Sequence, residues 1–149
     1  MIRPFGAGDA SPCSDLIHAC IMQDQQLSAE LRSRLLRQES PEIMIQRAGS
    51  FYIAVFDSTE GVVGVGGIEM NEIRLLYVAP EHQDTGIGGA LLAHLLAMVP
   101  PALFSDIFVY STLAAVDFYK KHGFASAGEF GFDCDGEQLT TVFMTKAIR

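Results

Sequence analysis

A glycine-rich turn is the part of this sequence whose residue types point most directly to chemistry. Residues 83–90 read QDTGIGGA and lie between an apolar strand-like run and an apolar helix-like run. The first N–H groups of a helix lack intrahelical partners and carry the positive end of the helix dipole, so they bind anions without a basic side chain. Gly86, Gly88 and Gly89 bring no Cβ into the turn. The turn therefore predicts a binding site for a phosphate or diphosphate group.

The glycine spacing distinguishes among the common nucleotide-binding turns. The sequence contains no GxxxxGK[ST], the pattern of a P-loop. A Rossmann turn follows the first strand of its fold and reads G-x-G-x-x-G. The run from Gly86 to Ala90 has no third glycine at that spacing and does not follow the first predicted strand. Its residues instead match Q-x-x-G-x-G, with Gln83, Gly86 and Gly88 in the specified places.

A second pattern follows the turn in the sequence. Its members are Ala115, Phe118, Tyr119, Gly123 and Phe124. In their order, separation and strand-to-helix context, the two patterns together resemble the two signatures of the GNAT-type N-acetyltransferases. The resemblance covers the chain well from Phe51 to the C-terminus and covers the residues before Phe51 only loosely.

The resemblance implies a fold and an activity. The fold is a single α/β domain spanning residues 1–149. It has a mixed, mostly antiparallel sheet of about six to seven strands flanked by helices. Its fourth and fifth strands splay apart, and the cofactor enters the gap. The activity is transfer of an acetyl group from acetyl-CoA, the cosubstrate, to a primary amine of a small molecule, protein or peptide, by direct attack in a ternary complex.

The resemblance also assigns cofactor contacts. Backbone groups of Leu76, Tyr77 and Val78 are expected to pair with the pantetheine arm as a strand pairs with its neighbour. The expected cradle of the diphosphate is Gln83, Asp84, Thr85, Gly86, Ile87, Gly88 and Gly89. Thr112 and Tyr119 complete the predicted cofactor-binding set.

Two of these positions depart from the family pattern. Asp84 places a negative charge beside the expected phosphates, where relatives often carry Arg, Lys or Gly. Thr112 holds a place that is often Asn in the family, and its hydroxyl can still donate one hydrogen bond. The first departure predicts weaker cofactor binding or an Asp84 side chain that points to solvent.

Acetyl transfer from a thioester to an amine needs two groups: a base for the proton of the amine and a donor for the departing thiolate. Tyr119 is the predicted donor, because its phenol carries a proton and the Tyr at this place is the acid in the family. The alternative is a core tyrosine that packs against neighbours at helical spacing, such as Ala115 and His122.

Glu72 is the predicted base. It stands eleven residues before Gln83, where histone-type members of the family carry a Glu at the head of the same strand. Several alternatives stay open, because an exposed Glu at a strand end is by default only solvated. They are Glu69, Glu81, His82 and a water relay.

Composition favours a single cytoplasmic domain. A chain of 149 residues with 49% hydrophobic content can bury one core and is too short for two ordinary domains. It lacks an apolar run long enough to span a membrane or to form the core of a signal peptide. Cys13 and Cys20 fall on the apolar stripe of a predicted helix, which indicates core thiols. His18 and His94 show no metal-ligand spacing, so we expect no metal.

The net charge of −8 argues against nucleic-acid and membrane partners, since both need a basic surface. It also counts against an acetyltransferase directed at ribosome-bound substrates, and it favours a cationic amine acceptor. A homodimer stays open. The alternative function is a non-catalytic acyl-CoA-binding sensor or interaction module, against which Tyr119 counts.

Periodicity and turn signals predict the surrounding elements. Before the turn we expect a strand at 2–5, a helix capped by Ser11 with Pro12 behind it, a helix at 28–37 and a shorter helix that starts at residue 40. These are followed by a hairpin of two strands, 51–56 and 62–70, and by a strand at 73–79. After it we expect a helix to 98, a strand at 103–110, a helix capped by Ser111 or Thr112 that closes at 120–123, and strands from 124 and 139. The first two helices and a loop at 130–137 are expected to choose the acceptor.

Overall fold

The computed structural model describes residues 1–148 and contains one continuous seven-stranded sheet in the order β1-β2-β3-β4-β5-β7-β6. The strands are β1 (Ile2–Pro4), β2 (Tyr52–Ser58), β3 (Gly61–Glu69), β4 (Glu72–Val78), β5 (Asp106–Ser111), β6 (Ala125–Cys134) and β7 (Glu137–Ala147). Neighbouring strands are antiparallel except β4 and β5, which are parallel. The predicted mixed, mostly antiparallel sheet is confirmed.

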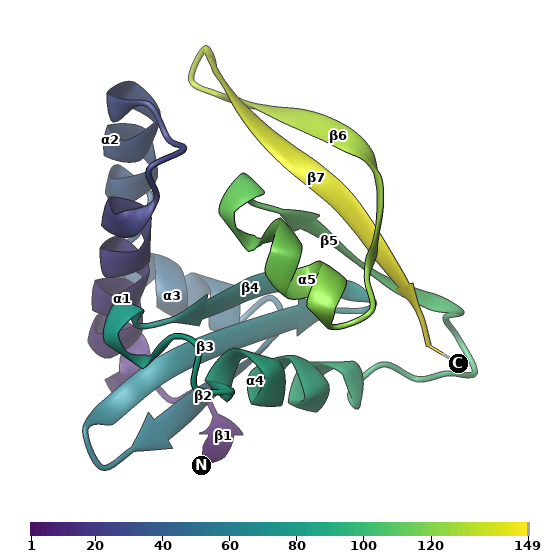
Figure 1. The fold of residues 1–149 in the computed structure, drawn as a ribbon. Helices are drawn as coiled ribbons and strands as arrows, with labels where there is room; N and C mark the ends of the chain where they lie inside the picture. The colour runs from purple at the N-terminus through teal and green to yellow at the C-terminus, as the bar shows by residue number, and fades with distance from the viewer. Residues whose placement is uncertain (149) are drawn as a thin grey trace.

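Helices cover both faces of the sheet (Figure 1). They are α1 (Ala10–Gln23), α2 (Ala29–Arg37), α3 (Pro41–Ala48), α4 (Ile87–Leu96) and α5 (Val116–Lys121). One core cluster joins α1 and α3 to β2, β3 and β4. A second cluster joins α4 and α5 to the opposite face, including β5 and β7. Within residues 1–148, none of the helices combines the length and apolar composition needed to cross a bilayer.

The sheet opens between β4 and β5. These strands pair only at Glu72 with Phe108 and at Ile73 with Val109. Beyond that point they diverge, which confirms the predicted splay. A bulge lies at the same place, because Ile68 of β3 faces Ile73 while the preceding Gly67 faces Leu75.

The start of α1 differs from the prediction. The helix begins at Ala10 directly after a 3₁₀ turn, so its N-cap is Asp9 and not Ser11. The Asp9 carboxylate does not cap the helix; it accepts hydrogen bonds from Arg3 at 2.8 and 2.9 Å. Ser11 and Pro12 lie in the first turn, where the missing N–H of proline breaks no helical bond.

The last predicted helix also begins later than expected. β5 extends through Ser111, and Thr112 then opens a 3₁₀ turn, Leu113–Ala115, before α5 starts at Val116. Neither predicted capping residue caps α5, because the 3₁₀ turn intervenes. The Ser111 hydroxyl instead donates to the Thr112 carbonyl at 2.7 Å.

The predicted loop at 130–137 is wrong. β6 runs to Cys134 and β7 starts at Glu137, so only Asp135 and Gly136 form the turn. Both have positive φ, 53° and 89°, as a two-residue type I′ hairpin turn requires. The Asp-Gly pair carried this signal in the sequence.

Candidate active site

The gap between β4 and β5 has the geometry of a ligand site. In open α/β sheets, ligands bind outside the carboxyl ends of strands where neighbours diverge. Val78 ends β4 and Ser111 ends β5, and the chain turns from these ends into α4 and α5. Both predicted signatures therefore border the same opening.

Backbone groups of β4 line one side of the gap. Alternate residues of a strand present their backbone groups to opposite neighbours. The Ala79 N–H donates to Val63 of β3 at 2.9 Å, so the backbone groups of Val78 and Leu76 face the gap. Tyr77 turns its backbone toward β3, opposite Val65. Of the three strand residues predicted to pair with the cofactor, Leu76 and Val78 turn their backbone groups to the gap and Tyr77 does not.

The Val78 carbonyl at the mouth of the gap is already engaged. It accepts hydrogen bonds from the Cys20 thiol at 3.1 Å and from the Gln83 amide at 3.0 Å. The Gln83 amide also exchanges hydrogen bonds with the Gln23 side chain of α1 at 3.1 and 3.3 Å. Gln83, the first signature residue, therefore fastens the turn to β4 and α1.

The first turn of α4 offers unpaired N–H groups. Gly86 is the N-cap and has a left-handed backbone, with φ of 89° and no side-chain cap. The first helical bond runs from Ala90 N–H to Gly86 O at 3.0 Å, so the N–H groups of Ile87, Gly88 and Gly89 precede it. These groups and the helix dipole make an anion site.

Gly88 and Gly89 have a packing role that the sequence did not reveal. A Cβ at Gly88 would lie 3.1 Å from the Phe118 ring, and one at Gly89 would lie 2.8 Å from His122 Nε2. These glycines therefore let α5 approach the first turn of α4. Gly86 has nothing within 4 Å, and its need for glycine comes from its positive φ.

Tyr119 projects from α5 into the core on the same side of the sheet as α4. It is 4% exposed, and its ring packs edge-on against Phe118 and Phe124 at centroid distances of 5.2 Å. Burial, and to a smaller extent the phenol of Tyr77, raise the pKa of Tyr119. The phenol therefore keeps its proton at neutral pH, which is the form of a hydrogen-bond donor.

Glu72 lies at the closed end of the gap. Its side chain is 25% exposed, and its carboxylate lies 4.0 Å from Arg74 Nε. Burial raises the pKa of Glu72; Arg74 lowers it and Glu69 raises it to smaller extents. A carboxylate with a raised pKa is a better proton acceptor than an ordinary surface Glu.

The sequence matches the family model described as "Acetyltransferase (GNAT) domain" over residues 19–147. The chain belongs to the GNAT acetyltransferase family. It is therefore an acyltransferase, as the two signatures predict. A comparison with curated proteins found no match.

Solved structures share this GNAT fold at low sequence identity. The GCN5-related N-acetyltransferase from Rhodopseudomonas palustris gives a TM-score of 0.91 at 20% identity, covering 99% of this chain and 94% of that one. PaiA N-acetyltransferase from Thermoplasma acidophilum, in complex with coenzyme A, gives 0.77 at 19%, covering 99% and 98%. A GNAT phosphinothricin acetyltransferase from Sinorhizobium meliloti, in complex with AcCoA, gives 0.73 at 21%, covering 99% and 87%.

The other candidate bases of this GNAT protein occupy two places. Glu69 faces Glu72 across β3 and β4 and forms an ion pair with Arg74 at 2.5 Å. Glu81 and His82 lie past the carboxyl end of β4, where His82 Nε2 is 3.6 Å from Glu60. Glu69 therefore shares the closed end of the gap with Glu72, whereas Glu81 and His82 stand beside the glycine turn.

The remaining turn residues have local partners. Asp84 is exposed with φ of 61°, and the Thr85 hydroxyl donates to the His82 carbonyl at 2.5 Å. Thr112 is half-buried at the end of β5, and its carbonyl accepts the Ala115 N–H at 3.1 Å.

The histidines of the predicted helices have single partners. His18 Nε2 lies 2.8 Å from the Glu39 carbonyl, and His94 Nε2 lies 2.8 Å from the Tyr52 hydroxyl. In the part of the chain that the structure describes, no group of three or more His, Cys, Asp or Glu side chains is placed to hold a metal ion.

Sequence reasoning missed two contributors to this site. Cys13 is fully buried, as predicted, but Cys20 is half-buried and reaches Val78 at the mouth of the gap. Burial raises the pKa of the Cys20 thiol to about 11, so it stays protonated as a donor. The second contributor is the set of aromatic residues on β5, β6 and β7. The F-x-Y at 108–110 and the F-x-F at 130–132 were the available signal, because residues two apart in a strand lie on the same face of the sheet.

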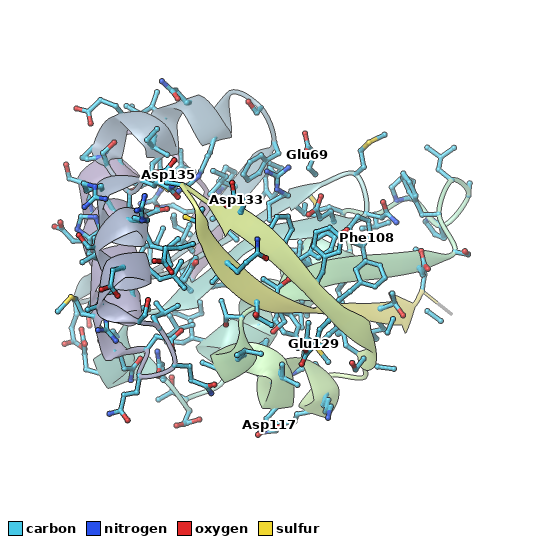
Figure 2. All side chains as sticks on the ribbon, turned by 90° about the horizontal axis from the view of Figure 1, so that it is seen from above. Glu69, Phe108, Asp117, Glu129, Asp133 and Asp135 are labelled. Atoms are coloured by element: carbon cyan, nitrogen blue, oxygen red, sulfur yellow. The ribbon has the colours of Figure 1, made fainter. Side chains whose placement is uncertain are left out.

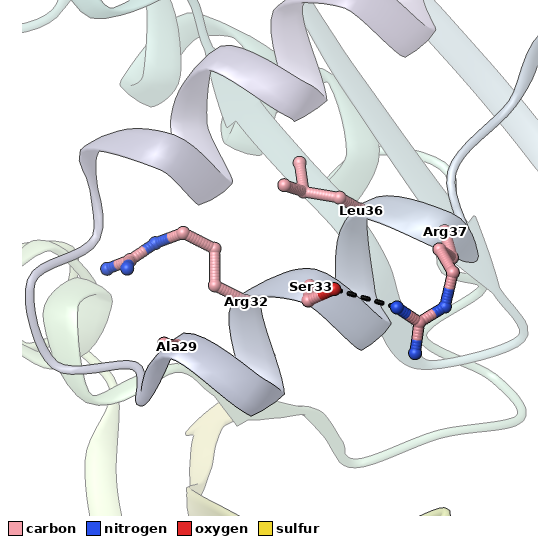
Figure 3. Close-up of a pocket in the computed structure, with 5 residues that line it drawn as sticks. All are labelled: Ala29, Arg32, Ser33, Leu36 and Arg37. Carbon is pink, nitrogen blue, oxygen red and sulfur yellow. Dashed lines mark hydrogen bonds between the residues drawn. The ribbon is translucent and has the colours of Figure 1, made fainter.

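A hollow of about 390 Å³ lies on α2, away from the gap (Figure 3). It is lined by Ala29, Arg32, Ser33, Leu36 and Arg37. Arg32 caps α1 by donating to the Asp24 carbonyl at 2.5 Å, and Arg37 donates to the Ser33 hydroxyl at 2.7 Å. Both guanidinium groups are thus engaged within the protein, and the hollow is not a candidate for the acetyl-transfer site.

Proposed function

We propose that this GNAT protein transfers an acetyl group from acetyl-CoA to a primary amine by direct attack in a ternary complex. The observation that carries the proposal is the gap between β4 and β5, which has an uncapped helix N-terminus at its mouth. The diphosphate binds the N–H groups of the first turn of α4. The pantetheine arm pairs with the backbone of Leu76 and with the N–H group of Val78, whose carbonyl already accepts from Cys20 and Gln83.

The acid and the base approach the reacting carbon from opposite faces of the sheet. Tyr119 belongs to the cluster on the side of α4 and α5. The side chain of Ile73 belongs to the same cluster, so the adjacent Glu72 points to the other side. Because the strands separate directly after Ile73, groups from both sides can meet in the gap. The cofactor therefore approaches from the side of Tyr119 and the acceptor from the side of Glu72.

The reaction needs two proton transfers. The neutral amine attacks, and Glu72 takes the proton that its nitrogen loses, directly or through water. The amine nitrogen forms a bond to the thioester carbon, and the C–S bond breaks. Tyr119 donates its proton to the departing thiolate. Burial keeps the proton on the Tyr119 phenol, the form that donates, and it makes the ionised Glu72 a stronger proton acceptor than a solvated carboxylate.

Calorimetric titration with acetyl-CoA tests the cofactor step, with free CoA and NAD as comparisons. We expect micromolar binding of acetyl-CoA and CoA and no heat with NAD. Absence of acetyl-CoA binding would overturn the proposal. Binding without turnover of small-molecule, polyamine and peptide amines would instead support the acyl-CoA-binding module.

A further inference from the structure

An aromatic surface covers part of the sheet beside Glu72. We call it the aromatic face; its members are Phe108, Tyr110, Phe130, Phe132 and Phe143. Tyr110 is central, since its ring centroid lies 5.2 Å from those of Phe132 and Phe143 and 5.3 Å from that of Phe130. Neighbouring rings meet at tilted or edge-on angles, the arrangements that aromatic pairs prefer.

Strand register places the aromatic face on the acceptor side of the gap. Residues opposite each other on paired strands lie on one face of a sheet. Phe108 is opposite Glu72, Tyr110 follows two residues later, and Phe143 is opposite Tyr110. The aromatic face is therefore continuous with the carboxylate that we propose as the base.

The far end of the aromatic face is closed by the tip of the β6–β7 hairpin. Arg34 of α2 lies 3.3 Å from Asp135 at this tip, and the Gln38 amide lies 3.7 Å from Cys134 Sγ. Figure 2 looks down on the hairpin and shows its tip, marked by Asp133 and Asp135, beside the helices. The aromatic face therefore runs from the closed end of the gap to a bridge between the hairpin and α2.

Charge at the inner end of the aromatic face favours a cation. Glu69 and Glu72 face each other there, and Arg74 is the cation placed against both. Two carboxylates against one guanidinium leave a net negative charge. An ammonium group is attracted to this place, and the adjacent Phe108 ring adds a cation–π contribution.

We propose that the acceptor is a small arylalkylamine, a primary amine joined to an aromatic ring by a short alkyl chain. This inference rests on the proposed function, whose acceptor it specifies. The ring of the acceptor stacks on the aromatic face and its amine reaches Glu72. Tyr110 and its neighbours are thus specificity-determining residues.

The rings of the aromatic face are accessible to a ligand. Phe130 and Phe132 are 47% and 40% exposed, whereas Phe108, Tyr110 and Phe143 are half-buried. The exposed parts of the rings offer a planar aromatic ligand stacking or edge-on contact.

Steady-state acetyl transfer, followed as thiol release from acetyl-CoA, tests the proposal with a matched pair of acceptors. 2-Phenylethylamine and 2-cyclohexylethylamine carry the same aminoethyl chain and differ in the ring, which is planar and aromatic in the first and saturated and puckered in the second. We expect kcat/KM to be about twofold to tenfold higher for the aryl compound, the range of one aromatic pair. Tyr110→Leu should raise KM for 2-phenylethylamine about tenfold while the Kd of acetyl-CoA stays unchanged.

Phe56→Leu on β2 is the control, because it makes a similar change away from the aromatic face. Faster transfer to spermidine or a peptide amine than to 2-phenylethylamine would overturn the acceptor class and leave the transfer reaction intact. Calorimetric binding of 2-phenylethylamine, lost in Tyr110→Leu, with no turnover of any amine would overturn transfer and support the aromatic site. A dimer in light scattering that Tyr110→Leu dissociates would make the aromatic face a self-association surface and overturn the proposal.

Discussion

Glu72 of β4 and Phe108 of β5 are directly opposite each other in the parallel register, one residue before the last pair that joins these strands. The pair thus stands where the sheet stops being continuous. A carboxylate there is partly desolvated by its neighbours and still borders the opening. The same pair connects the proposed base to the aromatic rings of β5, β6 and β7. The group that takes the proton of the amine therefore lies beside the residues proposed to select the acceptor.

Replacing Glu72 by Gln should change activity and stability in opposite directions. Burial raises the pKa of Glu72 above its ordinary value, so the folded state holds this proton more tightly than the unfolded state does. Stability from this group is therefore present at acid pH and lost as pH rises through the raised pKa. We expect Glu72→Gln to raise the free energy of unfolding at pH 7 by less than about 1 kcal/mol, measured by urea titration.

The same substitution should remove the rise of kcat/KM with pH that deprotonation of Glu72 produces. Glu69→Gln is the matched control, since it removes the opposite carboxylate on β3. An unchanged pH profile in Glu72→Gln would assign the base elsewhere, and loss of the rise in Glu69→Gln alone would assign it to Glu69.

Tyr119→Phe should lower kcat without weakening cofactor binding. The substitution keeps the ring that packs against Phe118 and Phe124 and removes the phenol proton. General-acid catalysis contributes about 100-fold or more, so kcat should fall by about that factor while the calorimetric Kd of acetyl-CoA stays unchanged. Tyr77→Phe is the control, because it removes the neighbouring phenol from β4. Full activity of Tyr119→Phe would make Tyr119 a core residue only.

Local patterns predicted the parts of the site that depend on consecutive residues. The Q-x-x-G-x-G turn and its position between a strand and a helix follow from short-range backbone chemistry, and the structure adds the left-handed backbone of Gly86. The predicted starts of the helices at 28 and 40 are local signals as well, and there Ser28 and Ser40 cap α2 and α3 by accepting from Leu31 and Ile43 at 3.1 and 3.2 Å.

Contacts between residues that lie far apart in the sequence could not be predicted from such local patterns. The contact of Gly89 with His122 depends on how closely α4 and α5 pack, and nothing near Gly89 in the sequence encodes that distance. The aromatic face likewise depends on the register that sets Tyr110 opposite Phe143. A one-residue slip of register would turn these side chains to the other face.

Asp84→Asn should strengthen acetyl-CoA binding. Asp84 has φ of 61°, a conformation that Asn also tolerates, so the substitution removes a charge and keeps the backbone. One like charge removed beside a phosphate at the surface is worth about 1 kcal/mol, so the calorimetric Kd should fall about fivefold at low salt and less at high salt.

Asp135→Asn is the matched control for this prediction. Asp135 also has positive φ, 53°, but lies at the tip of the β6–β7 hairpin, far along the chain from the glycine turn. The Kd of acetyl-CoA should not change in Asp135→Asn. Equal effects in both variants, or none in Asp84→Asn, would contradict a diphosphate bound beside Asp84.

Gly89→Ala should destabilise the fold although alanine is the better helix former. Its Cβ would lie 2.8 Å from His122 Nε2, closer than ordinary van der Waals contact allows. Overpacking of this kind costs about 1–3 kcal/mol, against about 1 kcal/mol gained in helix propensity. The free energy of unfolding should fall by up to about 2 kcal/mol in urea titration.

Gly8→Ala is the control for this prediction. A Cβ at Gly8 would have nothing within 4 Å, so the added methyl group should not lower the free energy of unfolding through a steric clash. His122→Ala should rescue Gly89→Ala in the double variant; if it does not, the contact between α4 and α5 is not the reason for glycine at this position.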